Sequence, residues 1–460
     1  MGQLLFHNLL LHLWAFATLN SPGPVSLVFT EEKNLIDSEL RSETTQYFTM
    51  ESIVKGQNEF NWDMFKLALA KDGAKNIFFS PYSIASASSM VLTGARGNTK
   101  TEIEKTFHFQ KLGTETDFLK GSKKLLDDVA PKSPKVRFDV ANKVFVDNGK
   151  NLLDVYRSNL KNYFNSDVGI EEFAKAPEKS REKINSWVES KTEQKIQELF
   201  PSGSLSAATH LVLANAVYFK GQWSIPFDAN DTHEGEFHLD SGDTVKCNMM
   251  WKNAKFPMHF DNELFLNIVM LPYAGDEFDF IAAVPQSSGF GFPDFDVQDD
   301  ADDDAPPPLD DMPPAPLDVK LSDLMKKISA DTISAWVQKL QDRAKGFVRD
   351  IDVFIPKFKV SFDMNLKEYL KGLGINDLFN ESADLSGMNG ERNLFCDSAI
   401  HKAFIEVNEE GTEASAATGM AMNLMSMPTQ VMFDRPFFYF IVHRQSNAII
   451  FSGKMNNPNM

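Results

Sequence analysis

Hydrophobic and polar positions along the chain follow two periods. Apolar residues recur every three or four positions in some stretches, which predicts amphipathic helices over Glu59–Ala70, Ser83–Thr93, Glu178–Phe200 and Leu321–Leu340. Other stretches are continuously apolar or alternating and rich in β-branched and aromatic residues, which predicts strands over Leu211–Phe219, Leu266–Tyr273, Phe278–Pro285, Ile351–Val360 and Phe437–His443. Helices and strands do not alternate strictly. The pattern therefore favours an α+β fold with several sheets over a doubly wound sheet.

The first residues of the chain differ from the rest. Leu9–Leu19 is an apolar run of the length of a secretory signal, and it contains an Ala-Phe-Ala sequence that resembles a cleavage site. The run is too short for a membrane span. We expect residues 1–21 to be a signal peptide, residues 22–58 to be a poorly ordered extension, and the protein to be secreted and extracellular. A buried N-terminal helix is the alternative.

Two sequence features bear on this compartment. Asn230 and Asn380 begin Asn-x-Thr and Asn-x-Ser sequons, and these fit a secreted glycoprotein. Cys247 and Cys396 are too few for a disulfide framework, so the fold depends on its hydrophobic core. Whether the two cysteines pair is left open by the sequence.

An acidic, proline-rich segment interrupts the chain at residues 293–318. It contains ten Asp and seven Pro, and we expect a disordered surface insertion, because like charges repel and proline removes hydrogen-bond donors. A weak calcium site or a docking segment for a basic partner is the functional alternative. The net charge of the whole chain is −18, which argues against nucleic acid as a main partner.

Motifs of catalysis are absent from the sequence. It has no G-x-S-x-G elbow, no H-E-x-x-H, no P-loop and no G-x-G-x-x-G after a strand. His233 and His238 flank a glutamate at a spacing that could suggest a metal, but incidental histidines in a loop or strand are the favoured interpretation. No sequence feature therefore supports an enzyme, although an enzyme of unknown type stays open at this point, and we expect no cofactor and no metal.

Five segments carry a resemblance to a known family. They are NIFFSPYSIASASSMVLTGARGNT at 76–99, LVLANAVYFKGQW at 211–223, FIPKFKV at 354–360, IHKAFIEVNEEGTEASAAT at 400–418 and FDRPFFYFIVH at 433–443. Through these motifs, in this order and spacing, residues 59–460 resemble a serpin, apart from the acidic insertion. The resemblance implies one domain of three β-sheets and about eight or nine helices. It also implies a monomeric inhibitor that traps a serine protease covalently, with no membrane attachment.

The resemblance places a reactive loop at residues 409–432. In serpins the cleaved loop inserts into the large sheet as a strand, and alternate residues of a strand face the packed side. The inward residues here are small and uncharged: Thr412, Ala414, Ala416 and Thr418. Together with Glu409, Glu410 and Gly411 they form the hinge, in which glycine provides the freedom to turn.

The same family spacing predicts the bond that the protease attacks. Seventeen residues counted from Glu409 end at Met425, so the reactive bond is Met425–Ser426. An apolar, flexible methionine suits elastase-like or chymotrypsin-like proteases and suits a trypsin-like pocket poorly. A non-inhibitory serpin that acts as a carrier, storage protein or folding factor is the alternative, but such relatives commonly place bulky or charged residues at the inward positions.

The resemblance also assigns residues to the moving parts of the large sheet. The shutter, a buried polar cluster under the place where the sheet opens, comprises Ser80, Ser83, Asn215 and His401. The breach, where the loop first inserts, comprises Trp223, Lys357 and Glu409, and the last two would form an ion pair. A basic group near the helix that some relatives use for heparin would be a weak glycosaminoglycan site: Lys120, Lys123, Lys124, Lys132, Lys135 and Arg137. Acidic residues are interleaved with it, so a solvated face is favoured.

Overall fold

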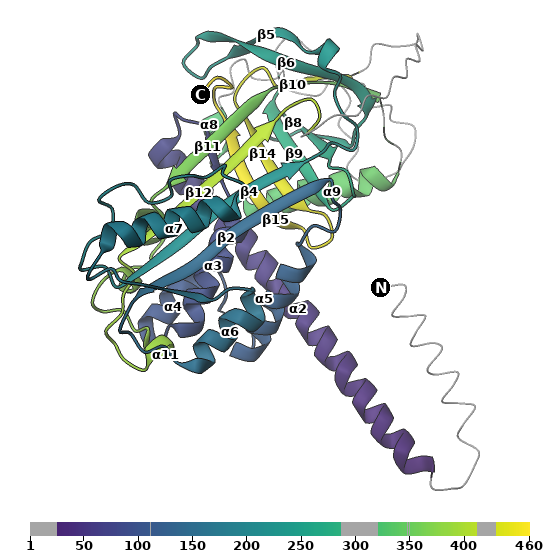
Figure 1. Cartoon of the computed structure of the whole chain (residues 1–460). Coiled ribbons are helices and arrows are strands. Elements are labelled where there is room, and N and C mark those ends of the chain that lie inside the picture. The colour runs from purple at the N-terminus through teal and green to yellow at the C-terminus, as the bar shows by residue number, and fades with distance from the viewer. Residues whose placement is uncertain (1–24, 111, 287–320, 347, 349, 412–428) are drawn as a thin grey trace.

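The computed structural model describes residues 25–110, 112–286, 321–346, 348, 350–411 and 429–460 (Figure 1). Three β-sheets with helices packed around them make up this part of the chain, so the predicted α+β class and the three sheets are confirmed. In the described residues, no helix combines the length and the apolar character that a membrane crossing requires.

The five-stranded sheet is the one in which the resemblance places the shutter and the breach. Its strands lie in the order β11 (Phe358–Met364), β12 (Ser398–Val407), β4 (Leu211–Gly221), β2 (Val136–Asp147) and β3 (Val168–Glu171). The pairs β11–β12 and β4–β2 are antiparallel, whereas β12–β4 and β2–β3 are parallel. We call the parallel boundary between β4 and β12 the seam.

The other two sheets complete the frame. The six-stranded sheet has the order β1 (Ile77–Phe79), β15 (Ala448–Met455), β14 (Phe437–His443), β9 (Phe278–Pro285), β8 (Leu266–Pro272) and β7 (Met258–Asp261). The four-stranded sheet has the order β13 (Thr429–Met432), β10 (Asp350–Pro356), β6 (Thr244–Lys255) and β5 (His233–His238).

Ten α-helices belong to the described part of the chain. They are α2 (Val25–Asp72), α3 (Pro81–Gly94), α4 (Gly97–Thr106), α5 (Glu115–Asp128), α6 (Asp154–Phe164), α7 (Pro177–Lys191), α8 (Leu321–Leu324), α9 (Ala330–Lys345), α10 (Leu366–Gly372) and α11 (Ser386–Asn389), with 3₁₀ turns at Ala229–Asp231 and Asp377–Phe379. The start of α3 is fixed locally: the Ser80 hydroxyl caps it by accepting a hydrogen bond from the Ser83 N–H, and Pro81 occupies the first turn.

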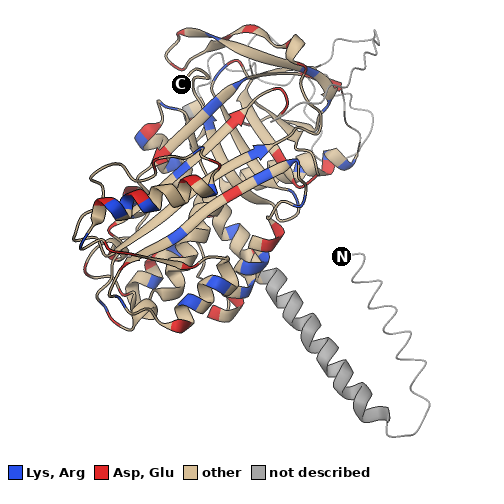
Figure 2. Ribbon diagram, viewed as in Figure 1, with Lys and Arg blue, Asp and Glu red and all other residues tan. Residues whose placement is uncertain are grey.

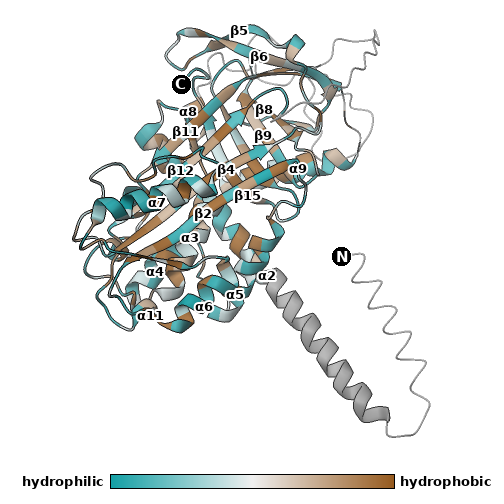
Figure 3. Ribbon diagram, viewed as in Figure 1, coloured by the Kyte–Doolittle hydropathy of each residue, from teal (hydrophilic) through white to brown (hydrophobic). Residues whose placement is uncertain are grey.

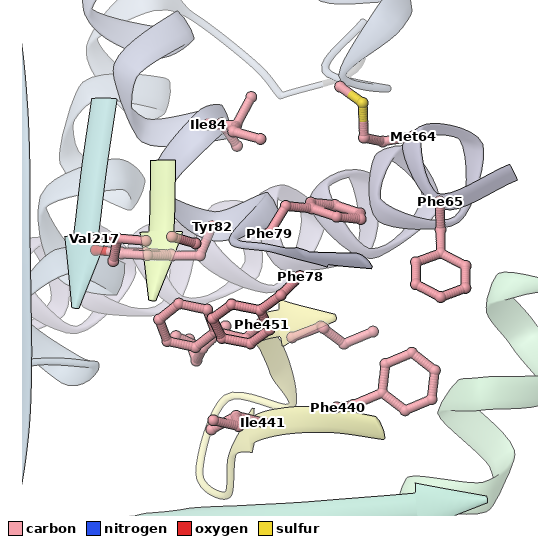
Figure 4. Close-up of a cluster of buried hydrophobic side chains, with 14 of the residues drawn as sticks. Met64, Phe65, Phe78, Phe79, Tyr82, Ile84, Val217, Phe440, Ile441 and Phe451 are labelled. Atoms are coloured by element: carbon pink, nitrogen blue, oxygen red, sulfur yellow. The ribbon is translucent and has the colours of Figure 1, made fainter. Parts of the chain in front are cut away.

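Two hydrophobic cores lie on opposite faces of the five-stranded sheet. The main core fills the space between this sheet, the six-stranded sheet and helices α2 and α3, and it includes a stacked pair of Phe78 and Phe451 with ring centroids 4.9 Å apart (Figure 4). The smaller core lies between the other face and α7, and contains Phe145, Ile184, Val188, Phe200, Ala214 and Ala216. The strands are largely apolar while α7 is largely hydrophilic (Figure 3), as expected for a helix that covers a sheet with one face only.

Three predicted elements have different bounds in the structure. The helix predicted to reach Phe200 ends at Lys191, because Glu193 and Gln194 adopt left-handed backbone conformations with φ of 47° and 60°. The helix predicted over residues 321–340 is two helices, and Ser329 caps the second. The strand predicted over residues 351–360 is two strands of different sheets, β10 and β11, which meet at Lys357.

The N-terminal extension and the two cysteines are both part of the packed structure. Residues 22–58 were expected to be poorly ordered, whereas α2 begins at Val25, and Met50, Ile53 and Val54 on it are buried in the main core. Both Cys247 and Cys396 are free and buried. The packed body of the protein therefore begins before residue 59 and contains no bond between its two cysteines.

Candidate functional site

The chain turns back on itself where it leaves the seam. After β12 ends at Val407, residues 408–411 reverse direction and lie against the chain that follows β4. The Phe227 N–H donates to the Glu409 carbonyl at 2.8 Å, and the Trp223 N–H donates to the Glu410 carbonyl at 3.1 Å. Residues 408–411 therefore form a turn that is fixed beside the end of the seam.

The carboxylate of Glu409 is held from two sides. Lys357 Nζ lies 2.8 Å from Glu409 Oε2, and the Thr232 hydroxyl donates to Glu409 Oε1 at 2.8 Å. Burial acts to raise the pKa of Glu409, whose exposure is 8%, but the hydrogen bonds from Lys357 and Thr232 oppose it and the pKa is lowered from its usual value. Lys357 can reach this carboxylate because it occupies the junction between β10 and β11.

Trp223 and Gly411 fix the backbone of the same turn. The Trp223 indole Nε1 donates to the Asn408 carbonyl at 2.8 Å, and the ring stacks on Tyr273 with centroids 4.6 Å apart. Gly411 has φ of +76°, and a Cβ there would lie 2.3 Å from the Gly221 carbonyl oxygen. Only glycine fits this position. The turn also brings together the three residues of the predicted breach, Trp223, Lys357 and Glu409.

The four predicted shutter residues also lie together, at the middle of the seam, where β4 and β12 are shown in Figure 1. Asn215 of β4 and His401 of β12 are paired neighbours across the seam, and their side chains are bonded through Asn215 Oδ1 and His401 Nδ1. Beneath them, Asn215 Nδ2 donates to the Ser83 carbonyl at 2.9 Å, and the Ser80 N–H donates to His401 Nε2 at 3.1 Å. All four residues are fully buried.

The protonation of His401 follows from these bonds. Nε2 accepts from a backbone N–H, so the proton of the neutral ring is on Nδ1, which donates to the Asn215 side-chain oxygen. Burial lowers the pKa of His401 to about 3. The shutter is therefore a neutral hydrogen-bond network at physiological pH.

Two partners in these groups were not identified from the sequence. Asn142 of β2 is the neighbour of Asn215 on the side away from the seam; it donates to the Ser83 carbonyl at 3.0 Å and accepts from the Ser83 hydroxyl at 3.0 Å. Thr232 supplies the second hydrogen bond to Glu409. β2 also carries Arg137, Asp139 and Lys143, so no local signal singles out Asn142, and none marks Thr232 as a partner of Glu409.

Several predicted residues lie outside the described residues. These are Thr412, Ala414, Ala416, Thr418, Met425 and Ser426 of the reactive loop, the acidic insertion and the signal segment. The chain is described again from β13, whose Thr429 pairs with Ile351 of β10. The inward positions and the reactive bond thus stay predictions.

The remaining predicted sites are on the surface. Asn230 and Asn380 are exposed; Asn230 lies within one 3₁₀ turn, and Asn380 directly follows the other. The basic group near α5 is interspersed with acids (Figure 2): Lys123 and Lys124 pair with Asp127 and Asp128, and Arg137 pairs with Asp139 and Glu193. His233 and His238 lie on β5, and within the described ranges no cluster of His, Cys, Asp or Glu is arranged to hold a metal ion.

Comparison with known proteins identifies the family to which this fold belongs. A sequence model described as "Serpin (serine protease inhibitor)" matches residues 55–295 and 312–458, and so omits most of the acidic insertion. The chain is similar to a serine protease inhibitor of Cyanea capillata (38% identity, 86% of this chain and 95% of the relative) and to leukocyte elastase inhibitor A of Mus musculus (33% identity, 89% and 100%).

Solved structures give the same result. Uncleaved ovalbumin matches with a TM-score of 0.75 at 26% identity, over 88% of this chain and all of that chain. Human thyroxine-binding globulin in complex with thyroxine matches with a TM-score of 0.73 at 25% identity, over 89% and 99%. With the family matched over most of its length and the fold matched over the same range, this chain belongs to the serpins, the serine protease inhibitors, and is not an enzyme.

Proposed function

We propose that this serpin acts as a suicide inhibitor, which traps the acyl-enzyme of a serine protease by inserting its cleaved reactive loop into the seam. The observation that carries the proposal is the parallel pairing of β4 and β12, beside whose end residues 408–411 turn and bond to the chain that follows β4. A strand that returns after β12 runs antiparallel to β12, and therefore also antiparallel to β4. One parallel pairing would be replaced by two antiparallel pairings, which are slightly more stable per residue.

The energy available supports such a transition. A strand that gains on the order of ten ladder hydrogen bonds at about 1 kcal/mol each gains on the order of 10 kcal/mol. A buried charge at an inward position would cost several kcal/mol, and about 1.4 kcal/mol is tenfold in rate. The small, uncharged inward residues of the hinge fit this requirement, because insertion has to be faster than hydrolysis of the acyl-enzyme.

For the target we propose an elastase-like or chymotrypsin-like protease. Met425, the residue predicted to present its carbonyl to the protease, is apolar and unbranched and fits an apolar primary pocket. The similarity to a leukocyte elastase inhibitor supports the same class. A trypsin-like pocket would leave its buried carboxylate unpaired.

The decisive experiment mixes the purified protein with elastase, chymotrypsin and trypsin. An SDS-resistant adduct with the first two supports the proposal, and mass spectrometry of the released C-terminal peptide should find Ser426 as its first residue. Thr412→Arg should be cleaved without forming an adduct, because a guanidinium cannot be buried cheaply beneath the sheet. Cleavage of the wild type without any adduct would instead indicate a non-inhibitory serpin.

We also propose that the protein is secreted and glycosylated. The apolar run at Leu9–Leu19 supports a signal peptide, and the exposure of Asn230 and Asn380 leaves both sequons accessible to a glycan. Expression of the full chain in animal cells tests both points. We expect the protein in the medium, without its first residues, and with a mass that falls on enzymatic deglycosylation; retention inside the cells at full length would contradict secretion.

A further inference from the structure

The outer face of the seam, opposite the shutter, has its own side-chain pairs. Across the boundary, Ala214 is the neighbour of Ile400, Ala216 of Lys402, and Tyr218 of Phe404. The first two pairs contain a small residue of β4. The third consists of two aromatic rings.

The Tyr218–Phe404 pair joins the two strands directly. The ring centroids are 6.1 Å apart with an interplanar angle of 38°, which is within the range of favourable aromatic contacts. Tyr218 is buried, with an exposure of 4%. On its other side its neighbour is Asp139 of β2, which carries no ring, so the aromatic contact of Tyr218 within the sheet is directed across the seam.

The position of this pair along the seam is intermediate. Tyr218 is three residues before Gly221, at the end of β4, and Phe404 is three residues before Val407, at the end of β12. Asn215 and His401 of the shutter lie three residues further in on the same strands. A strand that inserts from the breach therefore separates Tyr218 from Phe404 before it separates Asn215 from His401.

Insertion is incompatible with this contact. Neighbouring strands lie about 4.8 Å apart, so a strand placed between β4 and β12 moves them to about twice that separation, beyond the range of about 7 Å over which ring centroids interact. The contact thus exists in the intact protein and is lost in the inserted form. Contacts of the smaller core that involve only β2, β3 and α7 do not cross the seam.

We propose that Tyr218 and Phe404 are positioning residues that form an aromatic latch on the seam and set how readily it opens. The inference rests on the proposed function, because the seam has to open for the loop to insert. A contact of this kind changes a rate by about two- to tenfold when it is broken before the transition state. Loss of either ring should speed opening by this factor.

The test compares Phe404→Val with two matched variants. Valine suits a strand but removes the ring, and Phe404→Tyr keeps the ring. Phe145→Leu alters a buried aromatic residue that packs on Trp187 of α7 and does not cross the seam. Each protein is measured intact and after cleavage in the reactive loop. The readouts are the thermal midpoint of both forms and the rate at which the intact form loses inhibitory activity on warming without protease.

The expected pattern separates a latch from ordinary packing. Phe404→Val should lower the midpoint of the intact form more than that of the cleaved form and speed the loss of activity about two- to tenfold, while Phe404→Tyr behaves as the wild type. Phe145→Leu should lower both midpoints alike. Equal shifts of both forms by Phe404→Val, or an unchanged rate, would overturn the latch. Failure of the wild type to form an SDS-resistant adduct would instead count against the proposed function, and the two failures are distinguishable.

Discussion

The residues of the breach and those of the shutter are held together by different kinds of interaction. At the breach, a carboxylate with 8% exposure is held by a lysine whose side chain is 38% exposed, so one partner of the ion pair stays in contact with water. At the shutter, four fully buried residues form a network without net charge. The breach is therefore an electrostatic contact that solvent conditions modulate, and the shutter is a neutral contact that solvent does not reach.

This difference indicates a division of tasks. A half-exposed ion pair contributes little stability, and its partners can be hydrated when it breaks. A buried network is costly to leave half satisfied, because each unpaired donor or acceptor loses its water without compensation. Insertion of a strand would thus begin at the breach, where breaking the ion pair costs little free energy. It would then reach the shutter, where each buried group has to exchange its hydrogen-bond partner for a new one.

The largest effect should come from breaking the shutter. Asn215→Ala leaves the Ser83 carbonyl and the His401 Nδ1–H with fewer partners, and we expect the free energy of unfolding of the intact protein to fall by about 3 kcal/mol. Urea denaturation measures this. Ser190→Ala, which removes an exposed hydroxyl bonded to the Trp187 carbonyl, is the control and should change the value by less than about 0.5 kcal/mol. Similar values for both variants would contradict the comparison.

The second effect is a pH dependence of the shutter. His401 binds a proton near pH 3 in the native protein, whereas an unfolded histidine does so near pH 6.5, so the unfolded state takes up the extra proton as the pH falls. Stability should therefore be lost from about pH 6.5 downward, by up to about 1.4 kcal/mol per pH unit. His443, whose pKa is lowered to about 4 by burial, acts in the same direction.

The contribution of His401 is isolated by a variant. Between pH 7 and 5, the unfolding free energy of His401→Gln should fall less steeply than that of the wild type, by the slope of one proton. Glu409 acts in a separate window: its lowered pKa contributes stability that is lost only as the pH falls below about 4.5. Parallel slopes for wild type and variant above pH 5 would contradict the assignment to His401.

A smaller effect is expected at the breach. Glu409→Gln should lower the unfolding free energy by about 1 kcal/mol, since the hydrogen bonds to a charged acceptor are weakened and Lys357 can turn to solvent. A double-mutant cycle with Lys357→Met gives the coupling energy. The matched pair is Lys359–Glu406, a more exposed ion pair between β11 and β12 at 3.1 Å, for which a coupling of only a few tenths of a kcal/mol is expected.

The smallest predicted effect is that of salt on the ion pairs, which should distinguish them from the neutral shutter. From 0.1 to 1 M NaCl the screening length falls from about 10 to about 3 Å. The Lys359–Glu406 coupling should vanish, the Lys357–Glu409 coupling should persist in part because Glu409 is buried, and the cost of Asn215→Ala should stay unchanged. A salt-dependent cost at Asn215 would show that the shutter is not shielded from solvent.

The sequence predicted the type of most long elements but not where they end. Residues 351–360 satisfy a strand pattern throughout, yet the chain changes sheet at Pro356 and Lys357, because proline cannot donate in a ladder. The helix predicted to reach Phe200 ends at Lys191 because of backbone conformations that no periodicity reveals. The split between α8 and α9 had a signal in Ser329 and Thr332, which form a capping box.

For the site, motif positions were predictable and their partners were not. The resemblance predicts Ser80, Asn215, His401, Lys357 and Glu409. In the structure, His401 is bonded to both Ser80 and Asn215, and Lys357 and Glu409 form an ion pair. Asn142 and Thr232 were missed. Each contacts a residue more than fifty positions away, and such contacts are set by strand register and by the path of a turn rather than by local pattern.

The free cysteines have a practical consequence for following the seam. Burial raises the pKa of Cys247 to about 11 and that of Cys396 to about 12, so few thiolates are present at neutral pH and both react slowly with alkylating reagents. A cysteine introduced on an exposed position of β11 or α7 would therefore be labelled selectively in the otherwise native chain. A fluorophore pair placed on either side of the seam could then report its opening in real time, without removal of the native thiols.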